Sequence, residues 1–287
     1  MIATLFRFGA RLPLAWLHGF GVLAGWAVYL AAPRYRQLLR ENLAASGVCA
    51  DAAAFRRTLC RAVAEAGKSV LELPALWFRP QDEVARLIRE CVGCEHIEAA
   101  HAAGKGILFL TPHMGCFEIT SLFYAARHPI TILYRPPKLS ALQPLLEAGR
   151  ARGKAALAPA DLSGVKALLR ALKRGEAAGI LPDQVPGRGE GVWAPFFGRP
   201  AYTMTLPARL AQATGATVLM AFGERLARGR GYRLWIAPVE VDWGRPAEET
   251  ATLLNCEIET LVRRNPAQYL WSYNRYKAPK GAQEPAC

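Results

Sequence analysis

The sequence predicts an α/β fold in which a mixed, largely parallel sheet is layered by helices and preceded by one apolar helix. Short apolar runs, such as Ile107–Leu110 and Ile130–Tyr134, alternate with longer stretches of helical periodicity, the pattern of strands buried between helices. Residues 12–32 contain no charged side chain and stand apart from the rest. We therefore expect an N-terminal membrane-anchoring helix (1–33), one large domain (34–277) and a flexible tail (278–287).

The uncharged segment is 21 residues long. As a helix it could cross a hydrocarbon core of about 30 Å, and Trp16 and Tyr29 near its ends suit the two interfaces. A cleavable signal peptide is disfavoured because Pro33 and Arg34 follow in place of a small-residue cleavage site. Several glycines make the segment only moderately apolar, so a half-immersed helix remains an alternative to a spanning one. The arginines that follow it place the next domain in the cytoplasm.

The remaining elements follow from periodicity and from helix start and stop signals. Asp51 is the expected N-cap of a long helix, and Pro74 ends or kinks that helix. Further helices are expected at 81–89, 117–127, 139–152, 163–174, 205–214 and 250–264, and strands at 107–110, 130–134, 179–181, 217–222 and 232–241.

Composition limits the possible partners. The net charge of +13 favours an anionic partner, whether nucleic acid, lipid or acidic protein. Seven scattered cysteines make a poor disulfide framework and favour a reducing compartment. Cys91 and Cys94 form a lone C-x-x-C with no further ligands at zinc spacing. We expect these two thiols to be small apolar core residues, and no metal site.

One histidine has an unusual setting. His113 follows the strand 107–110 in Thr-Pro-His-Met-Gly-Cys-Phe-Glu, and catalytic groups commonly lie where a parallel strand ends and a helix begins. Glu118 comes five residues later. On one helix those side chains would point about 140° apart, but a loop that turns at Gly115 would let them meet.

Such a pair suits general-base catalysis. A neutral imidazole takes the proton of an attacking hydroxyl or amine, and a carboxylate on its other nitrogen fixes the tautomer. The alternatives are a purely structural histidine and a solvated glutamate. Cys116 between them is an unfavoured nucleophile because nothing nearby lowers its pKa.

The chain resembles the bacterial lipid A biosynthesis (late) acyltransferases of the lauroyl/myristoyl type, which carry a His-x4-Glu/Asp motif. The resemblance covers nearly the whole chain, because the matching blocks occur in family order. They are the N-terminal apolar helix, Arg40-Glu-Asn-Leu43, Gly104–His113 with Glu118, Leu133-Tyr-Arg-Pro136, Leu181-Pro-Asp-Gln184, Ala194-Pro-Phe-Phe-Gly198, Pro266–Trp271 and Asn274-Arg-Tyr-Lys277.

The resemblance implies a glycerolipid acyltransferase-like fold, acyl carrier protein as donor, an anionic lipid acceptor and no cofactor. It implies His113 as general base and Glu118 as its partner. Substrate binding would fall to five further residues: Arg135, Asp183, Gln184, Phe197 and Gly198. Asp183 has a second interpretation, a structural carboxylate that holds loop amides or arginines. Family members often have Gly-Asn-Trp-Glu where this chain has Gly-Cys-Phe-Glu at 115–118, which puts the neighbouring pocket in doubt.

The resemblance also implies an inner-membrane location with the catalytic domain on the cytoplasmic face. Related families acylate ornithine lipids, glycerol phosphates or phosphatidylinositol mannosides, so the acceptor stays open between these and a lipid A precursor. A non-catalytic basic protein that binds membrane or nucleic acid is the remaining alternative. Nucleic acid is disfavoured because the arginines are dispersed and no recognised nucleic-acid motif is present.

Overall fold

A seven-stranded sheet forms the centre of the computed structural model, which describes residues 2–137 and 143–280. Its strand order is β1-β9-β8-β2-β5-β3-β4, and neighbouring strands are parallel except β8 and β9. The predicted mixed, largely parallel sheet is therefore confirmed. The strands are β1 (Ile88–Val92), β2 (Ile107–Leu110), β3 (Ile130–Tyr134), β4 (Ala155–Pro159), β5 (Ala177–Ile180), β8 (Thr217–Arg225) and β9 (Tyr232–Pro238).

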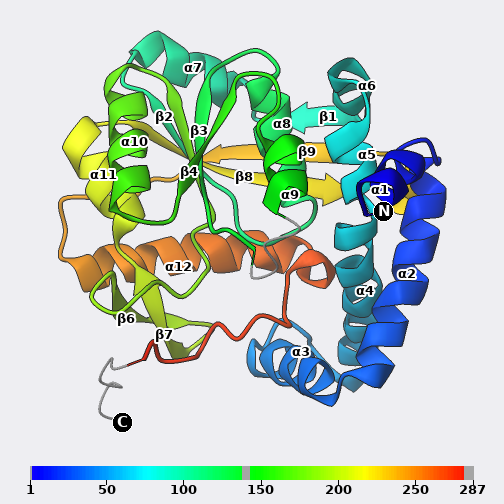
Figure 1. Cartoon of the computed structure of the whole chain (residues 1–287). Helices are drawn as coiled ribbons and strands as arrows, with labels where there is room; N and C mark the ends of the chain where they lie inside the picture. Colours follow the sequence, from blue (N-terminus) through cyan, green and yellow to red (C-terminus); the bar gives the residue numbers. More distant parts are fainter. Residues whose placement is uncertain (1, 138–142, 281–287) are drawn as a thin grey trace.

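Helices cover both faces of this sheet (Figure 1). Alternate residues of a strand point to opposite faces: Ile107 and Phe109 pack in one core with α7 and α8, whereas Leu108 and Leu110 pack in another with α10, α11 and α12. The helices are α5 (Leu73–Phe78), α6 (Gln81–Arg86), α7 (Glu95–Ala103), α8 (Phe117–Ala125), α9 (Gln143–Arg150), α10 (Leu162–Lys173), α11 (Leu206–Thr214) and α12 (Ala247–Arg264).

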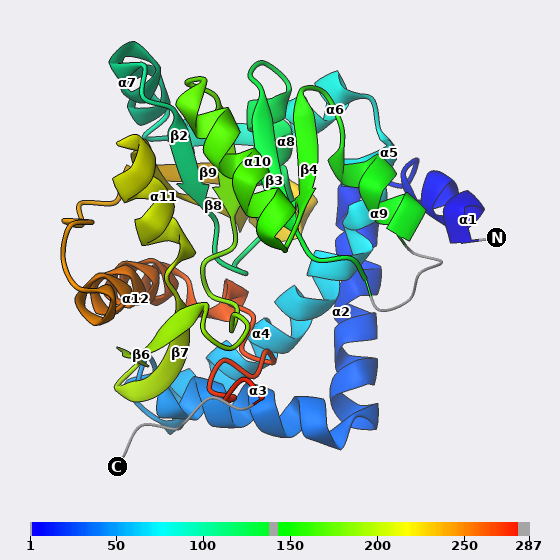
Figure 2. The same ribbon diagram turned by 60° about the vertical axis from the view of Figure 1, so that its left-hand side comes forward.

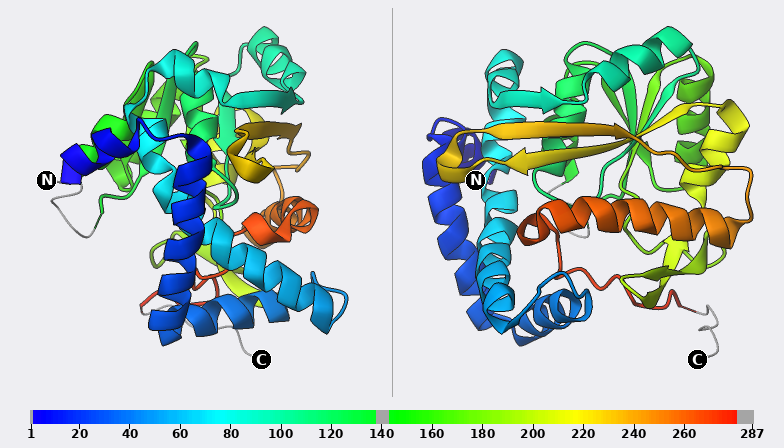
Figure 3. Two further views of the ribbon diagram at one scale, coloured as in Figure 1. Left: turned by 90° about the vertical axis from the view of Figure 1, so that its right-hand side faces the viewer. Right: turned by 180° about the vertical axis from the view of Figure 1, so that it is seen from behind.

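Three parts of the sheet region differ from the expectation. The helix predicted at 81–89 ends at Arg86, and Ile88–Val92 instead pairs as an edge strand with β9. β4 was not predicted. Nor was the hairpin of β6 (Gly191–Phe196) and β7 (Arg199–Met204), which packs beside α12 away from the main sheet (Figures 1 and 3). The start of the helix predicted at 139–152 lies outside the described residues, and its described part is α9.

The N-terminal helices form a separate layer at one end of the molecule: α1 (Ile2–Gly9), α2 (Leu14–Ala31), α3 (Pro33–Ala45) and α4 (Ala52–Leu71). Figure 1 shows α2 and α4 side by side, and in Figure 2 α3 runs across the lower end of the molecule from the foot of α2. A Cβ atom added at Gly67 of α4 would meet the backbone of Gly21 and Gly25 of α2, so glycines set this close approach. As predicted, Asp51 caps α4, accepting a hydrogen bond of 2.6 Å from the amide of Ala54.

The prediction that Cys91 and Cys94 are free apolar core residues is wrong in part. Both lie against the core beneath α7, but they form a disulfide. Their Cα atoms are 5.8 Å apart, within the range that a disulfide can bridge. The turn between β1 and α7 brings them together, and the sequence spacing alone did not reveal that turn.

Candidate active site

His113 and Asp183 meet at the carboxyl edge of the sheet. Leu110 and Ile180 are paired at the ends of the parallel strands β2 and β5, and each of the two residues follows three positions later. Nδ1 of His113 lies 2.8 Å from one carboxylate oxygen of Asp183, and the backbone N–H of His113 donates to the other oxygen over 2.9 Å. Asp183 thus holds both the ring and the backbone of His113.

The surroundings fix the tautomer of His113. Burial by itself would raise the pKa of Asp183, but the charge and hydrogen bonds of His113 outweigh it and lower that pKa. The ionised carboxylate only accepts hydrogen bonds, so Nδ1 must carry the ring proton. In the neutral imidazole Nε2 is then the unprotonated nitrogen, and the side-chain amide of Gln184 lies 3.0 Å from it, where it can donate. A substrate hydroxyl that reaches Nε2 must displace this amide.

A buried ion pair supports the loop that carries His113. The guanidinium of Arg225 binds both carboxylate oxygens of Glu72, at 2.7 and 2.9 Å, and donates to the carbonyl of Gly115 over 2.6 Å. Gly115 has a positive φ of 54°, and its amide donates to the backbone carbonyl of Gln268. The turn predicted at Gly115 is present, and segments far apart in sequence hold it.

Glu118 does not bind His113. Its carboxylate instead forms a two-point ion pair with Arg150, whose Nε lies 2.9 Å from one oxygen and 3.1 Å from the other. Glu118 is only 5% exposed. The carboxylate on the imidazole is therefore Asp183, and the expected contact between Glu118 and His113 is replaced by one with an arginine that sequence reasoning did not identify. Arg150 ends α9, which only tertiary packing brings to this edge.

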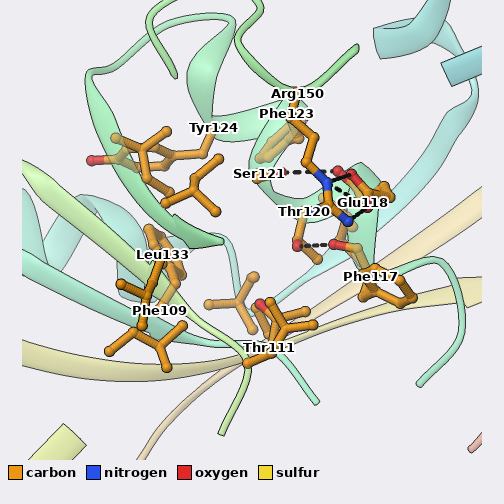
Figure 4. Close-up of a pocket in the computed structure, with 18 of the residues that line it drawn as sticks. Phe109, Thr111, Phe117, Glu118, Thr120, Ser121, Phe123, Tyr124, Leu133 and Arg150 are labelled. Atoms are coloured by element: carbon orange, nitrogen blue, oxygen red, sulfur yellow. Dashed lines mark hydrogen bonds and ion pairs between the residues drawn. The ribbon is translucent and has the colours of Figure 1, made fainter. Parts of the chain in front are cut away.

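Three cavities meet beside this cluster, with volumes of about 50, 420 and 380 Å³. Phe117 and Arg150 line all three, and His113 lines the two larger ones. The smallest lies between α8 and the sheet. Figure 4 shows the Glu118–Arg150 pair on one side of it and Tyr124 on the other. We call these the narrow, the large and the helix-side cavity, the last of which is walled partly by α4.

The other predicted binding residues separate into two groups. Arg135 follows β3 directly and lines the large cavity with Gln184 and Arg209. Phe197 and Gly198 line none of the three cavities. They form the two-residue turn between β6 and β7, with positive φ angles of 46° and 71°, as a type I′ hairpin turn requires. The structure therefore gives these two residues a place in the hairpin and not in the site.

Cys116 is an unsuitable nucleophile in this setting. It is buried at 1% exposure. Burial, reinforced by the charge of Glu72, raises the pKa of its thiol well above the ordinary value. The thiol therefore stays protonated, whereas nucleophilic cysteines react as thiolates.

Comparison with known proteins is consistent with this geometry. The sequence model of the family of bacterial lipid A biosynthesis acyltransferases matches residues 1–278. The chain is 30% identical over 229 residues to a lipid A biosynthesis lauroyltransferase of Escherichia coli K12, covering 79% of this chain and 74% of the relative. It is 28% identical to a lipid A biosynthesis palmitoleoyltransferase of the same organism, covering 74% and 68%. The identity to a phosphatidylinositol mannoside acyltransferase of Mycobacterium tuberculosis CDC 1551 / Oshkosh is also 28%, with the same coverage.

Proposed function

Since this chain belongs to the family of bacterial lipid A biosynthesis acyltransferases, we propose that it transfers a fatty acyl chain from acyl carrier protein to a hydroxyl group of a lipid A precursor. The observation that carries the proposal is His113, oriented by Asp183 and lining two cavities that open around it. No cofactor takes part in this reaction.

His113 acts as the general base. The acceptor hydroxyl displaces the Gln184 amide, gives its proton to Nε2, and attacks the thioester carbonyl. The carbon–sulfur bond then breaks, and the thiolate takes the proton back from the imidazolium. Asp183 stabilises that imidazolium through Nδ1. The displaced Gln184 amide remains beside the reacting carbonyl as a donor for its developing negative charge.

Glu118 acts through Arg150. The two-point ion pair fixes the guanidinium where the three cavities meet, and arginine is well suited to bind phosphate or a developing oxyanion. In this mechanism the His-x4-Glu spacing supplies a base and an arginine-positioning carboxylate, in place of a directly bonded dyad.

The cavities suit two different substrates. The large cavity has Arg135, Arg150 and Arg209 in its lining and so suits a phosphorylated headgroup. The narrow cavity is lined mainly by aliphatic and aromatic side chains and so suits an acyl chain. The net charge of +13 also favours docking of an acidic carrier protein. Nucleic acid has no part in the proposed function.

We further propose that α2 anchors the protein in the inner membrane, facing the cytoplasm. It is long and apolar enough to span, and a third of its residues are buried within the protein. Four of its exposed apolar side chains, Trp16, Phe20, Leu23 and Leu30, fall on one stripe because steps of three, four and seven residues return to the same side of a helix. A fifth, Val28, is exposed beside this stripe.

The packing of α2 favours a half-immersed helix over a spanning one. The face opposite its apolar stripe is fixed to α4. Three exposed arginines of α4, Arg56, Arg57 and Arg61, would enter the bilayer if α2 crossed it together with its partner. Charged side chains in the hydrocarbon are costly. Residues 1–33 thus act as one membrane-binding unit with the domain at 34–277.

A phosphatidylinositol mannoside is the second candidate acceptor, because one relative carries that activity in its name. Ornithine lipid and glycerol phosphate are further possible acceptors for the same site. Mass spectrometry of total lipids from cells with and without this protein separates these possibilities. Loss of one acyl chain from lipid A supports the proposal, whereas unchanged lipid A with one altered lipid of another class would replace the acceptor.

A further inference from the structure

The narrow cavity follows one face of α8. Six residues of α8 line it. Four of them, Phe117, Thr120, Ser121 and Tyr124, recur at i, i+3, i+4 and i+7 and so share one side of the helix. The Cα atoms of the first and last are separated by about 10 Å along the helix axis. The volume of about 50 Å³ holds roughly four water-sized groups. An unbranched alkyl segment has the shape that fits such a space.

The two ends of this cavity differ. At the reaction end, Thr111, Phe117 and the Glu118–Arg150 pair border it, and Phe117 lies against His113 with ring centroids 5.2 Å apart. At the far end, the ring of Tyr124 forms part of the wall, away from Glu118 and Arg150 (Figure 4). The narrow cavity therefore runs from the Glu118–Arg150 pair toward the ring of Tyr124.

Tyr124 is firmly held in place. It is 4% exposed, and its ring packs edge-on against Phe109 with centroids 4.9 Å apart. Its hydroxyl lies 3.2 Å from Nε2 of His101 on α7, and the rings of His101 and His128 are stacked or tilted against it. These histidines lie behind Tyr124 and do not line the narrow cavity. A ligand that pushed the ring outward would break a partly buried hydrogen bond and disturb this aromatic packing.

We propose that Tyr124, braced by His101, is the floor of the acyl channel and sets the maximum length of the chain that the enzyme transfers. The inference rests on the proposed acyltransferase function and adds a substrate-selecting residue to it. Each methylene group gains from burial until the chain end meets the Tyr124 ring. A longer chain must displace the ring or leave its carbonyl short of His113.

The test is a competition among saturated acyl carrier protein thioesters that differ by two carbons, with full-length protein in detergent micelles. Tyr124→Ala deepens the channel, so its preferred chain should be at least two carbons longer than that of the wild type. The ratio of kcat/KM for the longer over the original chain should rise roughly tenfold, from the burial of two more methylene groups. Tyr124→Trp should shift the preference toward shorter chains.

Two further variants keep the result interpretable. Tyr124→Phe retains the ring and should keep the wild-type chain length. Tyr202→Ala removes a buried tyrosine that lines none of the three cavities and should leave the chain-length profile unchanged. If Tyr124→Ala does not fold, Tyr124→Trp still decides the matter. An unchanged profile in the folded Tyr124 variants would overturn the inference, whereas absence of transfer by the wild type with every donor would instead overturn the proposed function.

Discussion

Replacement of Asp183 by asparagine tests the revised catalytic pairing. The carboxylate accepts from both Nδ1–H and the backbone N–H of His113, at 2.8 and 2.9 Å, and is 2% exposed. Asparagine has nearly the same shape but only one acceptor oxygen and an amide that donates. It therefore satisfies one of the two hydrogen bonds and leaves no carboxylate to hold the proton on Nδ1 or to stabilise the imidazolium.

The expected loss is large and has two separable parts. Loss of tautomer control in a histidine–carboxylate pair costs about 10⁴-fold in kcat, or roughly 5 kcal/mol of transition-state stabilisation. Folding should lose less, about 1.5–3 kcal/mol for a hydrogen bond to a charged group. A domain of ordinary stability, about 5–15 kcal/mol, stays folded after such a loss. Asp183→Asn should therefore be a folded protein with very low kcat.

The assay is initial-rate acyl transfer to lipid A precursor, combined with urea unfolding of the same preparations. Asp242→Asn is the matched control, because Asp242 is exposed on the surface and bonded only locally to its own loop and Arg245; it should keep wild-type kcat. Glu118→Gln is the contrasting variant, because Glu118 binds Arg150 and not His113. If Asp183→Asn retained kcat within a few-fold of the wild type, the assignment of Asp183 as the partner of His113 would be refuted.

Three other predictions concern stability, the ion pair and the membrane. Burial alone would raise the pKa of Glu72, but Arg225 and a hydrogen bond with His18 lower it to about 2 from 4.5; this difference contributes about 3 kcal/mol above pH 4.5. The urea concentration at the unfolding midpoint should therefore decrease as the pH is lowered from 4.5 to 2. It should decrease less in a Glu72→Gln variant, which is already destabilised. Parallel plots of midpoint against pH for the two proteins would contradict this. Arg150→Leu leaves Glu118 buried without its ion-pair partner and should lose about 3 kcal/mol of stability as well as activity. Arg150→Lys should recover part of both. Equal losses in the two variants would argue against a charge-pair role. Leu23→Asp removes an exposed apolar side chain whose burial in the membrane contributes about 1.5–3 kcal/mol to binding. Co-sedimentation with anionic lipid vesicles should therefore fall at least tenfold. Undiminished binding would place the membrane-binding face elsewhere.

Strand ends were the most informative sequence signal. The apolar runs at 107–110 and 130–134 have the bounds of β2 and β3, and the position of His113 after β2 placed it correctly at the carboxyl edge. The pairing with Asp183 depends on β2 and β5 being parallel neighbours in register. Sequence patterns do not give strand order, so they favour a nearby glutamate as the partner, whereas a carboxylate 70 residues away takes that place.

Other differences also arise from long-range packing. Ile88–Val92 is a strand because β9 offers it an edge, and its own residues showed no alternation to indicate this. The Phe197-Gly198 pair reflects turn geometry, which a motif match cannot distinguish from substrate binding. The apolar length of α2 was read correctly, but its glycine-mediated contact with α4 became apparent only in three dimensions, and that contact is what favours a half-immersed helix.

His113 is proposed as the base for acyl transfer to a membrane lipid. The most direct measurement is the rate at which His113→Ala transfers a labelled acyl group from acyl carrier protein to lipid A precursor, relative to the wild type at equal folded concentration. Loss of the general base predicts a fall of about 10²–10⁴-fold. Transfer by His113→Ala at the wild-type rate would show that His113 is not the base.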